Sequence, residues 1–135
     1  MAIKIEHLKG VTPELVVALH AQGIRNSDDF LAESATPAQR KALAAALGVE
    51  TGVILELANR ADLARINGIG SIYSDLLEHT GVDTVKELST RRPDNLYQAI
   101  YSANQVKRLA KMPPSEDMVE GWVKQARVMS PVLQY

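Results

Sequence analysis

Cysteine is absent from the 135-residue chain, and aromatic residues make up only 4% of it. Without cysteine there can be no disulfide bond, thiolate metal ligand or cysteine nucleophile. The scarcity of aromatics argues against a surface on which the bases of a single strand stack. The N-terminal stretch MAIKIEHLKG is too polar for a secretory signal, and no apolar run approaches the roughly 20 residues of a membrane span. These absences favour a cytoplasmic protein that has no membrane partner.

An excess of charge of either sign is also missing. Fifteen basic and 16 acidic residues give a formal net charge of −1, so the chain lacks the overall attraction that many nucleic-acid-binding proteins use. Hydrophobic residues at 46% and charged residues at 23% are ordinary for a globular protein. The composition therefore predicts one domain, or two small ones in close contact, with a hydrophobic core.

Helix-start patterns are abundant. The stretch Thr36-Pro37-Ala38-Gln39 places an N-cap threonine, a first-turn proline and a glutamine at the third helical position, which together predict a capping box. Thr84 to Glu87 predicts a second capping box. Further helix starts are predicted at Thr12, Thr51 and Ser115. Because no stretch alternates with the period of a strand, we expect an all-α protein with short connections.

The two halves of the chain match at a fixed offset of 58 residues. Three identical pairs define this register: Gly10 and Gly68, Leu19 and Leu77, and Gly23 and Gly81. Conservative pairs lie between them, such as Ile24 with Val82. The pattern indicates an internal duplication. A helix that runs from near Thr51 towards Ile66 is expected to join the two halves.

Two glycines flank one isoleucine in the second half, where residues 63–77 read LARINGIGSIYSDLL. An apolar residue two positions before Gly68, the Gly68-Ile69-Gly70 hairpin, and the small and apolar residues Ser74 and Leu77 resemble the helix-hairpin-helix motif of DNA polymerases, repair nucleases and ligases. A helix start at Pro-Pro-Ser and a Trp122 helix extend the likeness. The whole chain resembles a bacterial family of tandem helix-hairpin-helix proteins of unknown function (DUF4332-like).

The resemblance implies an all-α fold in which two pseudo-repeated helix-hairpin-helix units pack into one compact body. The first unit, residues 1–60, would carry a degenerate hairpin, Gly10-Val11-Thr12. There Thr12 replaces the second glycine, Pro13 lacks an amide donor and Glu14 adds a negative charge, so the first hairpin is expected to be structural. The second unit, residues 61–135, would carry the intact hairpin.

The resemblance also implies a phosphate-binding site at the second hairpin. Its residues would be Gly68, Ile69, Gly70, Ser71 and Ile72. The amides of Gly70 and Ile72 would hold the phosphate, because free amides at the start of a helix attract anions. A side chain at Gly70 is expected to obstruct the approach and to conflict with the dihedral angles of the turn. The alternative is that the glycines only let two helices pack closely.

Metal ligation by side chains is not expected, because the three histidines lack the spacing of a metal site. The resemblance implies a different kind of ion site, in which the carbonyls of Ala64, Ile66 and Ile69 hold a monovalent cation. A patch of basic residues is a further candidate site, for nucleic acid or for an acidic partner. It would comprise Arg65, Arg91, Arg92, Lys107, Arg108 and Lys111. The alternative for these residues is an ordinary solvated helix face.

Catalysis is not expected, because no nucleophile elbow, Ser-His-Asp order or carboxylate pair is present, and no cofactor is implied. The first functional hypothesis is a non-catalytic binding module that holds the DNA backbone weakly and without sequence specificity through the second hairpin. The second is a protein-protein interaction or scaffold module in which both hairpins are purely structural.

Overall fold

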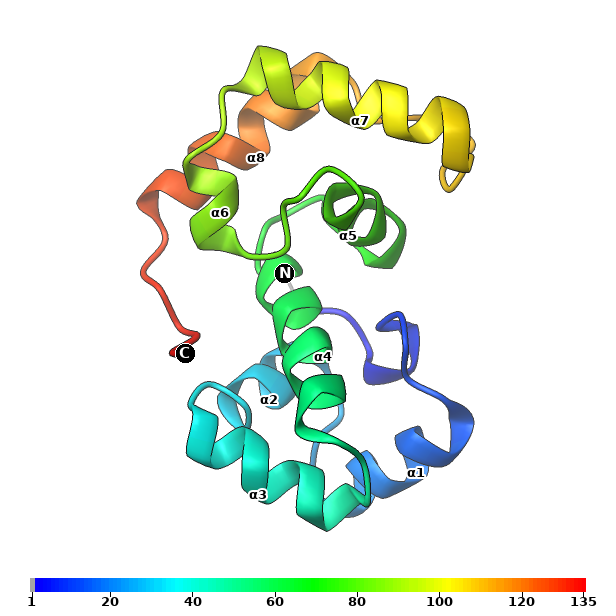
Figure 1. Cartoon of the computed structure of the whole chain (residues 1–135), viewed down its shortest axis with the longest axis vertical. Helices are drawn as coiled ribbons and strands as arrows, with labels where there is room; N and C mark the ends of the chain where they lie inside the picture. The colour runs from blue at the N-terminus through cyan, green and yellow to red at the C-terminus, as the bar shows by residue number, and fades with distance from the viewer. Residues whose placement is uncertain (1) are drawn as a thin grey trace.

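The computed structural model describes residues 2–135, which form two helical lobes joined by one helix (Figure 1). The helices of this described part, in chain order, are η1 (Ile5–His7, a 3-10 helix), α1 (Pro13–Ala21), α2 (Ser27–Ala32), α3 (Pro37–Leu47), α4 (Thr51–Leu63), α5 (Ser71–Glu78), α6 (Val85–Ser89), α7 (Pro93–Lys107) and α8 (Glu116–Val128). An isolated bridge between Lys4 and Asn26 is the one β-type pairing within residues 2–135. The prediction of an all-α fold is therefore confirmed.

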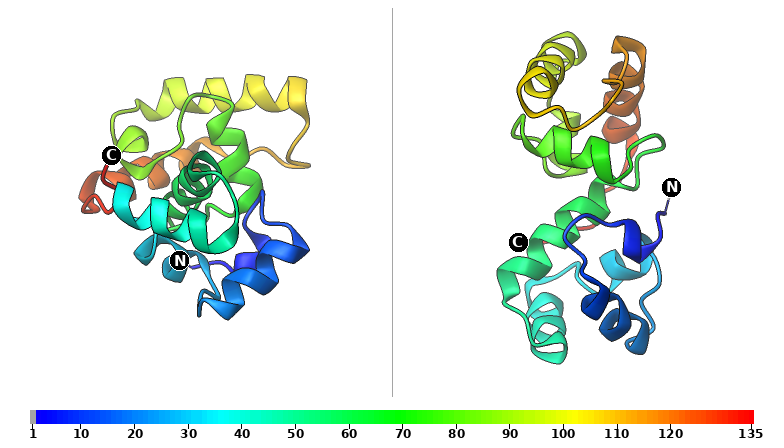
Figure 2. Two further views of the ribbon diagram at one scale, coloured as in Figure 1. Left: turned by 60° about the horizontal axis from the view of Figure 1, so that its bottom comes forward. Right: turned by 90° about the vertical axis from the view of Figure 1, so that its right-hand side faces the viewer.

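The first lobe contains η1 and α1–α3, and the second contains α5–α8 (Figures 1 and 2). Each lobe has its own hydrophobic core. The first core gathers around Phe30 and Ile54, and the second gathers around Leu77 and Trp122. Helix α4 supplies side chains to both cores, so it joins the lobes as expected. The division into units at residues 60 and 61 stays a prediction about domains.

Side-chain caps determine where most of the helices begin. Thr36 forms the complete capping box with Gln39, as predicted. Thr84 accepts the amide of Glu87, but the Glu87 carboxylate pairs with a neighbouring arginine, so only half of the second box forms. The cap predicted at Thr51 is wrong by one residue, because Glu50 already takes the N-cap position.

The local structures of the two halves correspond at the offset of 58 residues. Helices α5 and α6 begin at Ser71 and Val85, 58 residues after Pro13 and Ser27, which begin α1 and α2. The hydrogen bonds that close the turns after α1 and α5 also correspond, with the same donor and acceptor positions in each half. The descent of both halves from one duplicated unit stays a hypothesis.

A charged cluster connects the lobes beside α4. Lys9, from the turn after η1, pairs with the Asp75 carboxylate on α5, and Arg60 on α4 binds the same carboxylate at 3.1 Å. Burial of Asp75 favours its neutral form, but the hydrogen bonds and charges of Lys9 and Arg60 outweigh burial and lower its pKa. The cluster therefore ties the middle of α5 to the first lobe and to α4.

The C-terminal segment returns to the first lobe (Figure 1). The amide of Gln134 donates to the Ala35 carbonyl at 2.8 Å, and the buried Arg40 guanidinium donates to the Gln134 carbonyl at 2.6 Å. This return ties the end of the second lobe to the first.

Among residues 2–135 no single helix is long and apolar enough to cross a membrane. Helices α3 and α4 have the length and the apolar composition for this only when taken together, and the pair is bent by 116°.

Candidate functional site at the second hairpin

Gly68, the first glycine of the second hairpin, is explained by the fold. Its φ of +97° lies in the region that L residues rarely adopt. A Cβ atom there would also lie 3.0 Å from Nε1 of Trp122, whose side chain is buried in the second core. Close packing against α8 therefore requires glycine at this position.

Gly70, the second glycine, has no such explanation within the described chain. Its φ of −102° and ψ of −160° are extended angles that any residue adopts. A Cβ atom built on Gly70 would meet nothing within 4 Å. The expectation that the turn's dihedral angles exclude a side chain is therefore wrong, because the turn needs positive φ only at Gly68.

The start of α5 is open, whereas the start of α1 is closed. The Thr12 side chain accepts the amide of Leu15 at 3.2 Å and caps α1. Gly70 offers α5 no side-chain cap. Within residues 2–135 the amides of Ser71 and Ile72 have no acceptor outside their own helix, and such amides at a helix start favour anionic ligands. The first hairpin thus leaves only the Glu14 amide uncapped, because Pro13 has none, whereas the second leaves those of both Ser71 and Ile72.

A groove of about 640 Å³ opens beside these amides. We call it the hairpin groove; its nine lining residues are Gly68, Gly70–Tyr73 and Leu109–Met112. The floor is mostly apolar, and two of its large side chains are solvent-exposed, Ile72 by 55% and Met112 by 77%. Tyr73 holds the groove together, since its hydroxyl donates to the Met112 carbonyl at 3.1 Å and its ring packs on Trp122 with centroids 5.3 Å apart.

The one charged side chain that lines the hairpin groove is positive. Lys111 lines the groove directly, and no carboxylate lies among its nine lining residues. Arg108 and Lys111 line an adjoining hollow just beyond the end of α7, where Lys107 is also exposed. Part of the predicted basic patch therefore lies beside the second hairpin.

The other members of the predicted basic patch lie elsewhere or are held by neighbours. Arg65 binds the Asp62 carboxylate at 3.0 Å and a backbone carbonyl near the C-terminus. Arg91 and Arg92, each paired with a carboxylate, precede α7, whereas Lys107 ends it. The 15 residues of α7 correspond to about 22 Å of helix. The six residues therefore do not form one continuous patch.

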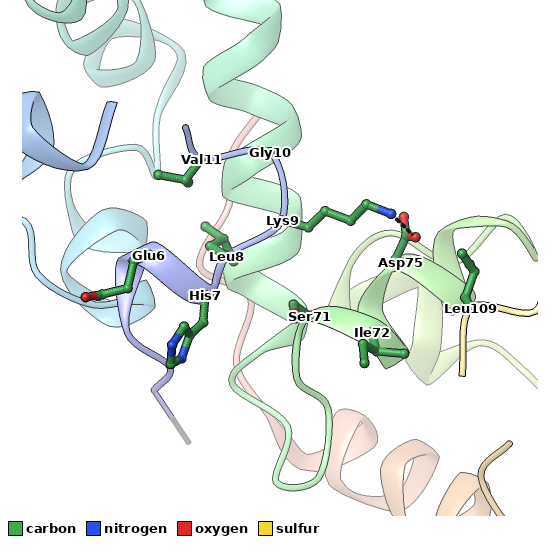
Figure 3. A pocket seen from close by; sticks show the side chains of 10 residues that line it. All are labelled: Glu6, His7, Leu8, Lys9, Gly10, Val11, Ser71, Ile72, Asp75 and Leu109. Carbon is green, nitrogen blue, oxygen red and sulfur yellow. Dashed lines mark hydrogen bonds and ion pairs between the residues drawn. The ribbon is translucent and has the colours of Figure 1, made fainter. Parts of the chain in front are cut away.

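A smaller hollow of about 300 Å³ adjoins the hairpin groove and shares Ser71, Ile72 and Leu109 with it (Figure 3). It separates the second hairpin from the turn that follows η1. Figure 3 shows Lys9 extending from that turn to Asp75, while Ser71 and Ile72 lie at the α5 side of the hollow. The first turn of α5 thus borders both hollows.

The carbonyls predicted to hold a monovalent cation lie in the turn between α4 and α5. The Ile66 carbonyl accepts the Ile69 amide at 3.2 Å, so this predicted ligand already has a hydrogen bond. Cation binding by Ala64, Ile66 and Ile69 stays a prediction. In the described part of the chain no three His, Asp or Glu side chains gather as a metal site.

Sequence reasoning missed the apolar floor of the hairpin groove. Its segment 109–112 follows α7 and precedes two prolines, which marks it as a loop but not as a neighbour of the second hairpin. The chain leaves α7 at Arg108 with a φ of +52°. An arginine does not predict this angle, so the direction of the loop could not be predicted from the sequence.

Comparison with known families shows where the chain belongs. A family model described as a domain of unknown function (DUF4332) matches residues 9–129. The chain belongs to this family. The match spans both lobes of the DUF4332 chain and confirms the family predicted from the sequence. Neither the comparison with curated proteins nor that with solved structures returns a match.

Proposed function

We propose that this DUF4332 chain is a non-catalytic, cytoplasmic binding module that holds a phosphodiester backbone at the start of α5. The observation that carries the proposal is Gly70, a glycine that the fold does not require. With neither a Cβ atom nor a cap above the Ser71 and Ile72 amides, a phosphate oxygen can reach both. Backbone amides at a helix start bind phosphate without help from a particular side chain.

The charges around the site support an anionic ligand of low affinity. Lys111 lies in the hairpin groove, and Arg108 lies in the hollow next to it. Each phosphate that a protein neutralises changes the slope of log affinity against log salt by roughly −0.9 on duplex DNA. Two nearby cations thus give a shallow slope and an affinity of about micromolar or weaker. Backbone contacts of this kind position a protein without reading sequence.

The test compares two glycine substitutions at helix starts. Gly70→Val places a branched side chain over the α5 amides, and Gly52→Val places the same side chain in the first turn of α4. Neither Cβ atom would meet a neighbour within 4 Å, so both variants are expected to stay folded by circular dichroism. We expect Gly70→Val to weaken duplex DNA binding at least fivefold at about 50 mM salt, where screening is weak, and Gly52→Val to leave it unchanged.

Two results would contradict this proposal. One is wild-type protein that binds neither DNA nor RNA at about 50 mM salt. The other is equal loss of binding in the Gly70 and Gly52 variants. Either would favour the second candidate, an interaction or scaffold module, which the contact of Gly68 with Trp122 supports, because that contact gives one hairpin glycine a purely structural role.

A further inference from the structure

The hairpin groove has an apolar floor that a phosphate does not need. Ile72 and Met112 are each more than half exposed to solvent, and both line the groove next to Leu109. Exposed apolar side chains that gather in one hollow indicate a ligand with an apolar part. The volume of about 640 Å³ lies within the roughly 300–1,000 Å³ that is usual for pockets that hold small organic groups.

A duplex backbone would leave this floor uncovered. In a duplex the bases are stacked inside, so a groove beside a bound phosphate meets only sugar. In a single strand the bases can turn outward and pack against protein side chains. The floor offers aliphatic and thioether groups, and a thioether adapts to flat partners of different shape. An unpaired base therefore fits the groove better than a paired one.

Two other occupants fit less well. A second copy of this chain would pair the same surface with itself, which would bring Lys111 and Arg108 of both copies together. A protein partner of stable affinity needs roughly 20–30 residues a side, whereas nine residues line the groove. The positive charge of Lys111 in the lining and of Arg108 beside it, together with the apolar floor, favours a flexible anionic strand with flat apolar groups.

We infer that the hairpin groove binds one or two unpaired bases of a single strand whose phosphate lies at the start of α5. The inference rests on the proposed function, because the phosphate position is that of the proposed backbone site. It goes beyond it by naming the ligand as unpaired nucleic acid rather than duplex. It also departs from the expectation from composition, since the base would pack on Ile72 and Met112 instead of on aromatic rings.

The first experiment compares three probes by fluorescence anisotropy at about 50 mM salt. They are a thymidine strand of about 12 nucleotides, an abasic strand of the same length, and a duplex of that length. We expect the thymidine strand to bind about five- to tenfold more tightly than the abasic strand, since a base packed on the floor removes apolar surface from water. Equal binding of the thymidine and abasic strands, or tighter binding of the duplex, would overturn the inference and leave the proposed function standing. Absence of binding to all three would overturn both.

The second experiment assigns the base preference to the groove. Met112→Ala removes an exposed side chain from the floor, and Val128→Ala removes one that is 85% exposed at the end of α8, away from the lining residues. We expect Met112→Ala to reduce the ratio of thymidine-strand to abasic-strand affinity to about half or less, and Val128→Ala to leave it unchanged. An unaltered ratio in Met112→Ala would contradict the groove as the base site. Displacement of the thymidine strand by an alternating glutamate–leucine peptide at equal or lower concentration would assign the groove to a protein partner instead.

Discussion

The packing role assigned to Gly68 leads to a quantitative prediction for Gly68→Ala. At a φ of +97° an alanine costs about 1–2 kcal/mol. Its Cβ would lie 3.0 Å from Nε1 of Trp122, and forcing an extra methyl group into a packed core costs about 1–3 kcal/mol. We therefore expect a loss of about 3 kcal/mol, a large part of the roughly 5–15 kcal/mol of a typical domain.

Urea unfolding of four glycine-to-alanine variants separates the cost of the positive φ from the cost of the close contact. At Gly70 the φ is ordinary and an added methyl group would meet open space. At Gly23 the φ is +80° and the space is also open. At Gly10 the φ is +97° and a Leu57 methyl group would lie 3.2 Å from the new Cβ atom. We expect the loss of stability to rise from Gly70 to Gly23, Gly10 and Gly68. The protein has a single tryptophan, so its fluorescence reports directly on the second core. If Gly68→Ala costs no more than Gly23→Ala, the contact with Trp122 does not explain the glycine.

Three further predictions concern stability. Thr36→Ala removes a complete capping box and should cost about 1 kcal/mol, more than Thr84→Ala, as measured by urea midpoints. Gly121→Ala should raise stability by about 0.5–1 kcal/mol in calorimetry, because Gly121 lies inside α8 and its Cβ would meet nothing within 4 Å. The lowered pKa of Asp75 means that its stabilising effect is present above about pH 3.8 and is lost as the pH falls through the lower folded value. Asp75→Asn should therefore lower the free energy of unfolding by about 2 kcal/mol at pH 7. In unfolding curves measured at a series of acidic pH values, its free energy of unfolding should depend less on pH than that of the wild type.

Features that depend on near neighbours in the chain could be predicted from the sequence. The capping box at Thr36 needs only residues three apart, and the start of α1 follows from Thr12 and Pro13. The box predicted at Thr84 forms only by half, because the Glu87 carboxylate pairs with Arg91. The pairing of Arg65 with Asp62 also lies within one helical turn, and the spacing of three residues could have removed Arg65 from the predicted basic patch.

Features that depend on distant segments could not be predicted. The contact between Gly68 and Trp122 joins residues more than 50 positions apart, and no local pattern relates them. The same holds for the segment 109–112, which completes the hairpin groove only because α7 and α8 place it beside α5. The helix-start amides of the candidate site therefore depend on near neighbours in the chain, whereas its apolar floor and its cations depend on tertiary structure.

The first half of the chain contains a natural counterpart of a substitution at Gly70. Thr12 occupies the equivalent position, with a φ of −82° and a ψ of 162°, and its side chain caps α1. The same turn therefore accepts a threonine, and in doing so occupies a helix-start amide. We expect Gly70→Thr to keep the fold and to raise the free energy of unfolding by about 0.5 kcal/mol, through the cap and a less flexible unfolded chain. By the same geometry its hydroxyl should accept the amide of Tyr73, the counterpart of Leu15. Its side chain should then cover the Ser71 and Ile72 amides and reduce DNA binding about as much as Gly70→Val does. A stable Gly70→Thr variant that binds DNA like the wild type would show that these amides do not hold the ligand.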